Sequence, residues 1–187
     1  MAAGHEEDAR VTGLVARVLT LDDHDAFAEI VALYQGRVRG FLTRLTGRRD
    51  VADDLAQETF LKAYRYLGTF EGRGRFVSWL LRVAYQEFVT SVRRARPDAV
   101  QLDATTAIGR ADDVGGADAR LTLEYAMRAL EPAERAALEL HYWHGLTHVE
   151  IATVLGSPIG TVKSQILRGR DKLRERLGAQ VNRTESR

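Results

Sequence analysis

The feature that most constrains this chain is a two-helix pattern over 146–177. Thr147 and Glu150 have the spacing of a capping box, in which a hydroxyl and a carboxylate bond the free backbone amides at a helix start. Gly156 follows, at a position where a left-handed residue can end that helix. Three apolar residues share one face of the helix between these signals: Ile151, Ala152 and Leu155.

A second helix is predicted directly after this turn. Ser157 suits the N-cap and Pro158 suits the first helical position. Its predicted buried stripe consists of Ile159, Val162 and Ile166. The opposite face carries cations and polar groups: Lys163, Ser164, Gln165, Arg168, Arg170, Lys172, Arg174 and Arg176. A basic helix alone is also typical of a solvated surface. Here the caps, the glycine turn and both apolar stripes share one register, which favours a helix-turn-helix that places one helix against DNA.

Composition limits the other possibilities. The chain has 187 residues, a formal net charge of +1 and a pI near 8.1, so any nucleic-acid surface must come from local clustering of cations. It has no cysteine, which excludes disulfides, thiolate metal sites and cysteine nucleophiles. Neither a membrane-spanning stretch nor the apolar core of a signal peptide is recognisable, so we expect a cytoplasmic protein without membrane insertion.

The N-terminal half shows helical periodicity. Residues 1–9 resemble a loose tail, and a short helix is expected around Leu14. A longer helix should begin after Asp23 and end at Gly47. Its apolar stripe is interpreted as core: Phe27, Ile30, Val31, Tyr34, Val38, Phe41, Leu42 and Leu45.

The next predicted helix covers 51–67, with Asp50 as its cap. A mostly polar and acidic set of residues lies largely away from its apolar stripe: Asp53, Asp54, Gln57, Glu58 and Leu61. Acidic residues near a helix start are favoured by the helix dipole. They could equally form a docking surface for a basic partner, and the spacing does not separate these two interpretations.

A glycine-rich loop over 68–75 precedes a third predicted helix, 76–94. Arg73 and Arg75 lie in the loop, and Trp79 lies in the first turn of the helix. Aromatic and basic groups around such a loop can stack on unpaired bases while they hold phosphates. The alternative is that the aromatic side chains here belong to the core.

The pattern predicts an all-α protein with two small helical domains. The stretch 97–118 is rich in aspartate and small residues, and we interpret it as a flexible acidic linker. The predicted helical domains are 22–96 and 119–178, flanked by an N-terminal segment, 1–21, and a tail, 179–187. In the second domain a helix should start at the Glu131-Pro132 pair, and its predicted buried residues are Ala136, Ala137, Leu140 and Trp143.

Two segments, in this order, resemble the extracytoplasmic-function (ECF) group of bacterial sigma-70 family sigma factors. The sequences DDLAQETFLKAYRYLGTF and FVSWLLRVAYQEFVTSVRR resemble region 2, a helical bundle. The stretch from ALEPAERAALELHYW to KSQILRGRDKLRERL resembles region 4, which contains a helix-turn-helix. The resemblance implies an alternative sigma factor that binds core RNA polymerase, recognises the −10 and −35 promoter elements and promotes DNA melting and transcription initiation. It implies no bond chemistry and no cofactor.

The resemblance also assigns residues to three surfaces. The surface for the β′ coiled-coil of the polymerase would contain Asp53, Asp54, Leu55, Gln57, Glu58 and Phe60. The −10 surface would contain Arg73, Arg75, Phe76, Trp79, Arg82, Tyr85 and Gln86. The −35 surface would contain Thr161, Lys163, Ser164, Gln165, Leu167 and Arg168. Further expected partners are the β flap of the polymerase and an anti-sigma factor.

Three positions depart from the pattern of the group. Gln86 stands where asparagine is common, Thr90 where aspartate is common, and Gln165 where arginine is common. An amide side chain can bond adenine through two hydrogen bonds, whereas arginine prefers guanine. The promoter sequence is therefore not transferable from the group.

Two other functions compete with this interpretation. A stand-alone DNA-binding regulator could use the same helix-turn-helix, but it would leave the N-terminal domain without a role. A metal-dependent enzyme or sensor could use His141, His144, His148 and Glu150 as ligands. Gly145 interrupts any helix through that cluster, so the four side chains would not share one face.

Overall fold

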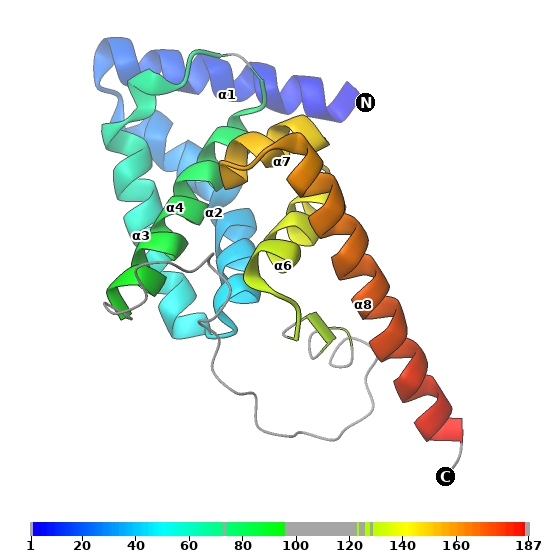
Figure 1. Ribbon diagram of the computed structural model, residues 1–187. Coiled ribbons are helices and arrows are strands. Elements are labelled where there is room, and N and C mark those ends of the chain that lie inside the picture. The colour runs from blue at the N-terminus through cyan, green and yellow to red at the C-terminus, as the bar shows by residue number, and fades with distance from the viewer. Residues whose placement is uncertain (1, 73, 96–122, 124–125, 128, 186–187) are drawn as a thin grey trace.

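Every element that the structure describes is helical (Figure 1). The structure is a computed structural model, and it describes residues 2–72, 74–95, 123, 126–127 and 129–185. The predicted linker, 97–118, and Arg73 therefore lie outside the described residues. Among the helices in the described ranges, none combines the length and the apolar character needed to cross a bilayer.

The first module is a helical bundle in which the first helix runs across one end of the others. Its elements are α1 (Ala2–Leu21), α2 (His24–Thr46), α3 (Arg49–Arg65), η1 (Leu67–Thr69) and α4 (Phe76–Ala95). The prediction of a loose tail over 1–9 is wrong, because α1 is one continuous helix. Buried Val11, Leu14 and Val18 fix it to the bundle, and an ion pair between Glu7 and Arg37 of α2 holds its early turns.

The helix boundaries in this module test the predicted caps. Asp23 is the N-cap of α2, as predicted, and its carboxylate accepts a hydrogen bond from the Ala26 amide at 2.9 Å. Gly47 ends α2 in a left-handed conformation, also as predicted, with φ 68°. The prediction that Asp50 caps α3 is wrong: the helix begins at Arg49, two residues before the predicted start, and the Asp50 carboxylate forms an ion pair with Arg48.

The second module contains the helix-turn-helix. Its elements are α6 (Pro132–Leu138), the π-helical turn η2 (Glu139–Trp143), α7 (His148–Leu155) and α8 (Ile159–Glu185). The predicted capping box is confirmed: the Thr147 amide donates to the Glu150 carboxylate at 2.8 Å, and the Thr147 hydroxyl accepts from the Glu150 amide at 3.3 Å. Gly156 has φ 62°, as a left-handed helix end requires.

Two predictions of burial in this module are wrong. Trp143 is 47% exposed, because the wider π-helical turn rotates it away from the side on which Leu140 is buried. Ile159 is 42% exposed, since α8 begins at this residue, one position after the predicted start at Pro158. The rest of the predicted α8 stripe, Val162 and Ile166, is buried.

The second module depends on a close crossing between α6 and α8. At Gly169 of α8, an added Cβ would lie 2.8 Å from Leu138 Cδ1 and 3.4 Å from Glu134 Cβ. Leu138 is fully buried, so it has little freedom to retreat. Beside the crossing, the Lys172 ammonium lies 2.8 Å from the Glu134 carboxylate and joins the two helices by charge.

We therefore predict that Gly169→Ala lowers the free energy of unfolding of the second module by about 1–3 kcal/mol through overpacking. Gly160→Ala is the matched control in the same helix, because a Cβ added at Gly160 would enter open space. It should be neutral or stabilise by up to about 1 kcal/mol. Thermal and urea unfolding of both variants measures this difference, and equal stability of the two would contradict the close crossing.

The two modules pack against each other through α2 with α6 and through α4 with α7 (Figure 1). Arg135 of α6 lies fully buried in this interface. Its guanidinium donates to the Leu45 carbonyl at 3.2 Å, in the last turn of α2, and to the Met127 carbonyl at 2.8 Å. A helix end carries carbonyls without intrahelical partners, and a cation satisfies both their hydrogen bonds and the helix dipole.

A second charged contact lies beside the first. Buried Glu139 of η2 forms an ion pair with Arg44 of α2, and the Arg44 guanidinium also lies 5.6 Å from the ring centroid of Trp143. Burial raises the pKa of the Glu139 carboxyl to about 7, although Arg44 opposes the shift. Nearby, His144 packs edge-on to Phe41, and burial lowers the pKa of its imidazole to about 4. We call Arg44, Arg135 and Glu139 the inter-module seam.

These shifts predict opposite pH effects. Glu139 holds its proton more tightly when folded, so its contribution to stability is complete below pH 4.5 and is lost as the pH rises toward about 7. His144 holds its proton less tightly when folded, so its contribution is lost as the pH falls from 6.5 toward about 4.

We predict that Glu139→Gln becomes more stable relative to the unmodified chain as the pH rises from 5 to 8, by up to about 3 kcal/mol. The reason is that the amide stays neutral where the buried carboxyl must ionise. His144→Asn is the control, and its advantage should appear only on acidification below pH 6.5. Urea unfolding at several pH values measures both effects, and a Glu139→Gln difference that does not vary with pH would refute the assignment.

Candidate nucleic-acid and protein interfaces

The acidic surface of α3 is open to solvent. Asp53, Asp54, Gln57 and Glu58 are all exposed. Asp53 forms an ion pair with Arg39 of α2 at 2.7 Å, and this hydrogen bond lowers the pKa of the Asp53 carboxyl. Asp54 and Glu58 lie one helical turn apart and have no ion pair in the described part of the chain that involves either side chain. They therefore present the uncompensated negative charge of this surface.

Two other residues assigned to this surface have a different position. Leu55 and Phe60 are buried in the core of the first module, so they support the surface rather than form it. Leu61, which the residue assignment left out, is 49% exposed beside the acidic residues. The sequence pattern had placed Leu61 away from the apolar stripe, although the resemblance did not assign it to the surface.

The aromatic residues of the loop and α4 form one packed cluster. Phe76 is fully buried, with its ring centroid 5.3 Å from that of Tyr34 and 5.4 Å from that of Trp79. Phe70 packs edge-on to Phe76 from the loop side. Phe76 is thus a core residue that positions its neighbours, whereas Trp79 is only partly buried and retains surface toward solvent.

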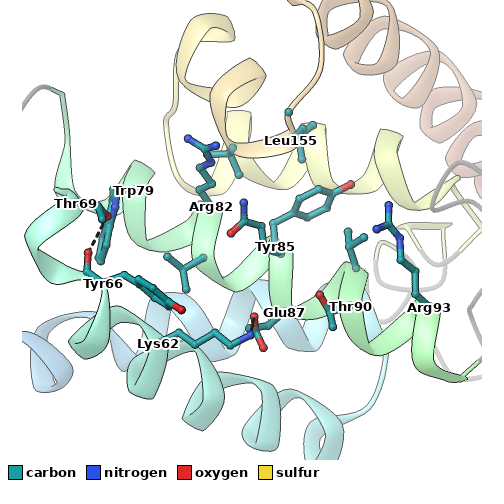
Figure 2. A pocket seen from close by; sticks show the side chains of 15 residues that line it. Lys62, Tyr66, Thr69, Trp79, Arg82, Tyr85, Glu87, Thr90, Arg93 and Leu155 are labelled. Atoms are coloured by element: carbon teal, nitrogen blue, oxygen red, sulfur yellow. Dashed lines mark hydrogen bonds and ion pairs between the residues drawn. The ribbon is translucent and has the colours of Figure 1, made fainter. Parts of the chain in front are cut away.

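The exposed side of this cluster opens into a hollow of about 830 Å³ (Figure 2). Four of the residues assigned to the −10 surface line it: Trp79, Arg82, Tyr85 and Gln86. Arg82 and Gln86 are exposed, whereas Tyr85 is buried. An aromatic ring, a guanidinium and an amide at one hollow can stack on a base, hold a phosphate and bond a base edge.

The hollow also has residues that the site assignment did not include. From the first module it adds Lys62, Tyr66, Thr69, Val83, Glu87, Val89, Thr90 and Arg93. Lys62 and Glu87 form an ion pair at 2.6 Å, which compensates the one carboxylate among these side chains. The opposite wall comes from the second module: Val154, Leu155 and Gly156. No sequence pattern links α4 to the end of α7, so only the packing of the modules identifies this wall.

Arg75, the remaining described residue of the assigned −10 surface, bridges the two modules. Its guanidinium donates to the Gly145 carbonyl at 3.1 Å, so in this arrangement the side chain is directed to the second module.

The surface of α8 is basic, but not all the residues assigned to it are exposed. Lys163, Leu167 and Arg168 are exposed, and Thr161 is partly exposed. The Ser164 hydroxyl donates to backbone carbonyls of its own helix at 2.9 and 3.1 Å. These residues share the outward side of the helix, in the position that a groove-binding helix would need.

Gln165 of α8 is buried, unlike these residues. It is 8% exposed, next to buried Val162 and Ile166, and its side-chain oxygen is buried without a hydrogen-bond partner. A buried amide without partners costs free energy, so this side chain is poorly satisfied in the present arrangement. It is therefore inaccessible in this arrangement, although it lies one helical turn from exposed Arg168.

The histidine cluster does not converge. The rings of His141 and His148 stack with centroids 5.3 Å apart, while His144 faces Phe41 on the other side of the turn. Glu150 is engaged in the capping box. Within the described ranges, no three side chains of the histidine, cysteine or carboxylate type are grouped as metal ligands would be.

Comparisons with known proteins match both modules. Residues 30–97 match the family "Sigma-70 region 2", and residues 120–173 match "Sigma-70, region 4". The ECF RNA polymerase sigma factor SigW of Bacillus subtilis is 34% identical over 170 residues, which cover 83% of this chain and 90% of the relative. The RNA polymerase sigma-H factor of Pseudomonas aeruginosa is 32% identical over 182 residues, or 90% of this chain and 92% of the relative.

A solved structure supports the same relationship. The sigma factor RpoE of Bartonella quintana, determined in complex with the anti-sigma factor NepR, has a TM-score of 0.66 and 27% identity. The match covers 81% of this chain and 96% of that one. The chain belongs to the sigma-70 family of RNA polymerase sigma factors, within the ECF group.

Proposed function

We propose that this chain starts transcription through three separate surfaces, each with its own partner. The acidic surface of α3 binds polymerase, the hollow along α4 binds the −10 element, and the outward side of α8 binds the −35 element. One observation carries this proposal: both sigma-70 regions are present in order, and each has an exposed surface whose charge suits its partner.

The polymerase surface rests on uncompensated charge. Asp54 and Glu58 are exposed on one side of α3, with apolar Leu61 beside them. Such a patch suits a basic helical partner, and we assign it the coiled-coil of the β′ subunit. The β flap is the proposed partner of the second module.

The −10 function rests on the hollow. Trp79 offers a partly exposed aromatic ring, Arg82 offers a cation, and Gln86 offers an amide, all along one side of α4. Stacking on an unpaired base contributes about 1–3 kcal/mol. Capture of unstacked bases here would offset the pairing energy that is lost when the promoter melts.

The −35 function rests on Lys163, Leu167 and Arg168 of α8. A cation and an apolar side chain on one helical side can contact a guanine edge and a thymine methyl in the major groove. The direct role of Gln165 in base reading requires a rotation of its side chain out of the buried position.

The chain would take a further partner of the anti-sigma class. The support is the similarity to a sigma factor whose structure contains such a partner. A stand-alone regulator is the competing function, but it assigns no role to the acidic surface of α3 or to the hollow.

Run-off transcription tests the proposal directly. Core RNA polymerase on a pooled promoter library should initiate at specific sites only when this protein is added. Sequencing of the selected promoters then shows which bases Gln86 and α8 read. Duplex binding without core binding or transcription would instead support the stand-alone regulator.

A variant separates polymerase binding from DNA binding. We predict that Asp54→Asn with Glu58→Gln weakens binding to core polymerase by about tenfold, equivalent to about 1.4 kcal/mol. Binding to selected −35 duplex should not change. Asp25→Asn, at an exposed acidic position on α2, is the control and should leave both affinities intact. Fluorescence titration with core enzyme measures the first affinity, and an unaltered value would exclude this surface.

A further inference from the structure

One buried carboxylate lies against the basic helix α8. Glu134 is the third residue of α6 and is 4% exposed. The crossing of the two helices brings it there, because a Cβ added at Gly169 of α8 would lie only 3.4 Å from Glu134 Cβ. This close approach lets a carboxylate on α6 reach the side chains that flank the glycine on α8. A carboxylate is costly to bury unless cations pair with it, so its partners are informative.

Two cations of α8 share this carboxylate. The Lys172 ammonium donates to both oxygens of Glu134, at 2.8 Å to Oε2 and 3.0 Å to Oε1. Arg168 Nε lies 3.5 Å from the same Oε1. An ionised carboxylate has about four acceptor sites, so one group can serve two cations that lie one helical turn apart. Glu134 therefore does more than join α6 to α8 through Lys172, because it also contacts a residue of the assigned −35 surface.

The contact with Arg168 uses one particular part of the guanidinium. Nε is the nitrogen nearest the aliphatic stem, whereas the two terminal nitrogens form a planar fork at the far end. The Arg168 side chain is 60% exposed, although the carboxylate beside its Nε is only 5% exposed. A contact at Nε restricts the plane of the guanidinium and leaves the terminal fork for a second partner.

We propose that Glu134 is a positioning residue for promoter recognition: it holds the Arg168 guanidinium in the plane that presents the terminal nitrogens to a guanine in the major groove. The inference rests on the proposed −35 function of α8. Arginine bonds guanine O6 and N7 with two parallel hydrogen bonds. A mobile arginine side chain loses rotamer freedom when it binds, and an arginine ordered beforehand by Glu134 loses less.

Positioning differs in sign from two simpler roles of this carboxylate. Glu134 is a negative charge close to a basic helix, so electrostatics alone predicts that its neutralisation strengthens binding to every duplex. A purely structural link between α6 and α8 predicts weaker binding to every duplex alike. Positioning predicts that one base preference falls, while affinity for unrelated duplex DNA stays the same or rises.

The test is selection from a library of duplexes with a randomised central segment, with the full-length chain as the binding protein. Comparison of the unmodified chain with Arg168→Ala identifies the base position that depends on Arg168. We expect guanine there, preferred about tenfold by the unmodified chain and not preferred by Arg168→Ala. Glu134→Gln should reduce this preference to about twofold and leave the other positions unchanged. Glu134→Asp keeps the charge but withdraws the carboxylate by one methylene, so it should reduce the same preference.

Three further variants separate positioning from charge and from stability. Glu131→Gln is the matched control, since it makes the same charge change at an exposed position three residues earlier, and it should leave the guanine preference intact. Lys172→Gln removes the other partner of Glu134 and should weaken binding to every duplex without a change in that preference. Glu134→Gln combined with Arg168→Ala should behave as Arg168→Ala does, because one residue acts through the other. Cooperative thermal unfolding of each variant is the check on folding.

An unchanged guanine preference in both Glu134 variants would overturn the inference, and so would equal weakening on every duplex. If Arg168→Ala weakens binding to all sequences alike, Arg168 contacts phosphate, and there is no base contact for Glu134 to position. Run-off transcription with core polymerase decides the sigma function separately. A reduced preference in the Glu134 variants without initiation by any protein would support positioning and refute the proposed function, whereas initiation with an unchanged preference would do the reverse.

Discussion

The hydrogen bonds of the buried Arg135 guanidinium hold the two modules of this chain together. Carbonyls at the end of α2 have lost their intrahelical partners, and a cation from α6 satisfies them. The same guanidinium binds the Met127 and Leu130 carbonyls, so it also fixes the approach to α6. Because it is fully buried, these bonds are shielded from water, and the position of the second module on the first depends on them.

That position determines which surfaces are available. The acidic surface of α3 and the outward side of α8 remain exposed, whereas the hollow along α4 is walled by the end of α7. The acidic surface of α3 and the outward side of α8 are therefore accessible while the hollow along α4 is partly covered. The net charge is only +1 because 27 basic residues nearly balance 26 acidic ones, but the acidic surface of α3 and the basic side of α8 are separated in space.

Local signals and packing have different roles in the second module. The Thr147–Glu150 capping box and left-handed Gly156 fix where α7 begins and ends. The approach of α8 to α6 depends on the missing side chain at Gly169, since any Cβ would meet Leu138. A helix of 27 residues can then extend from this crossing and present its basic side away from the core. Figure 1 shows α8 running outward from the rest of the molecule.

The sequence by itself determined the helix type, most helix boundaries and the family, because caps, glycine ends and 3.6-residue periodicity are local. It also separated exposed acidic α3 residues from the buried stripe. It did not predict that residues 2–9 continue α1, since their stability comes from pairs such as Glu7 with Arg37, which are distant in sequence.

Only the tertiary structure decided the remaining features. A π-helical turn exposed Trp143, and the folded structure buried Gln165 and Tyr85, which the resemblance placed on binding surfaces. The seam joins α2 to α6 and η2 across a stretch of sequence with no periodicity. Contacts of that kind depend on how two completed units fit together, and spacing within either unit carries no information about them.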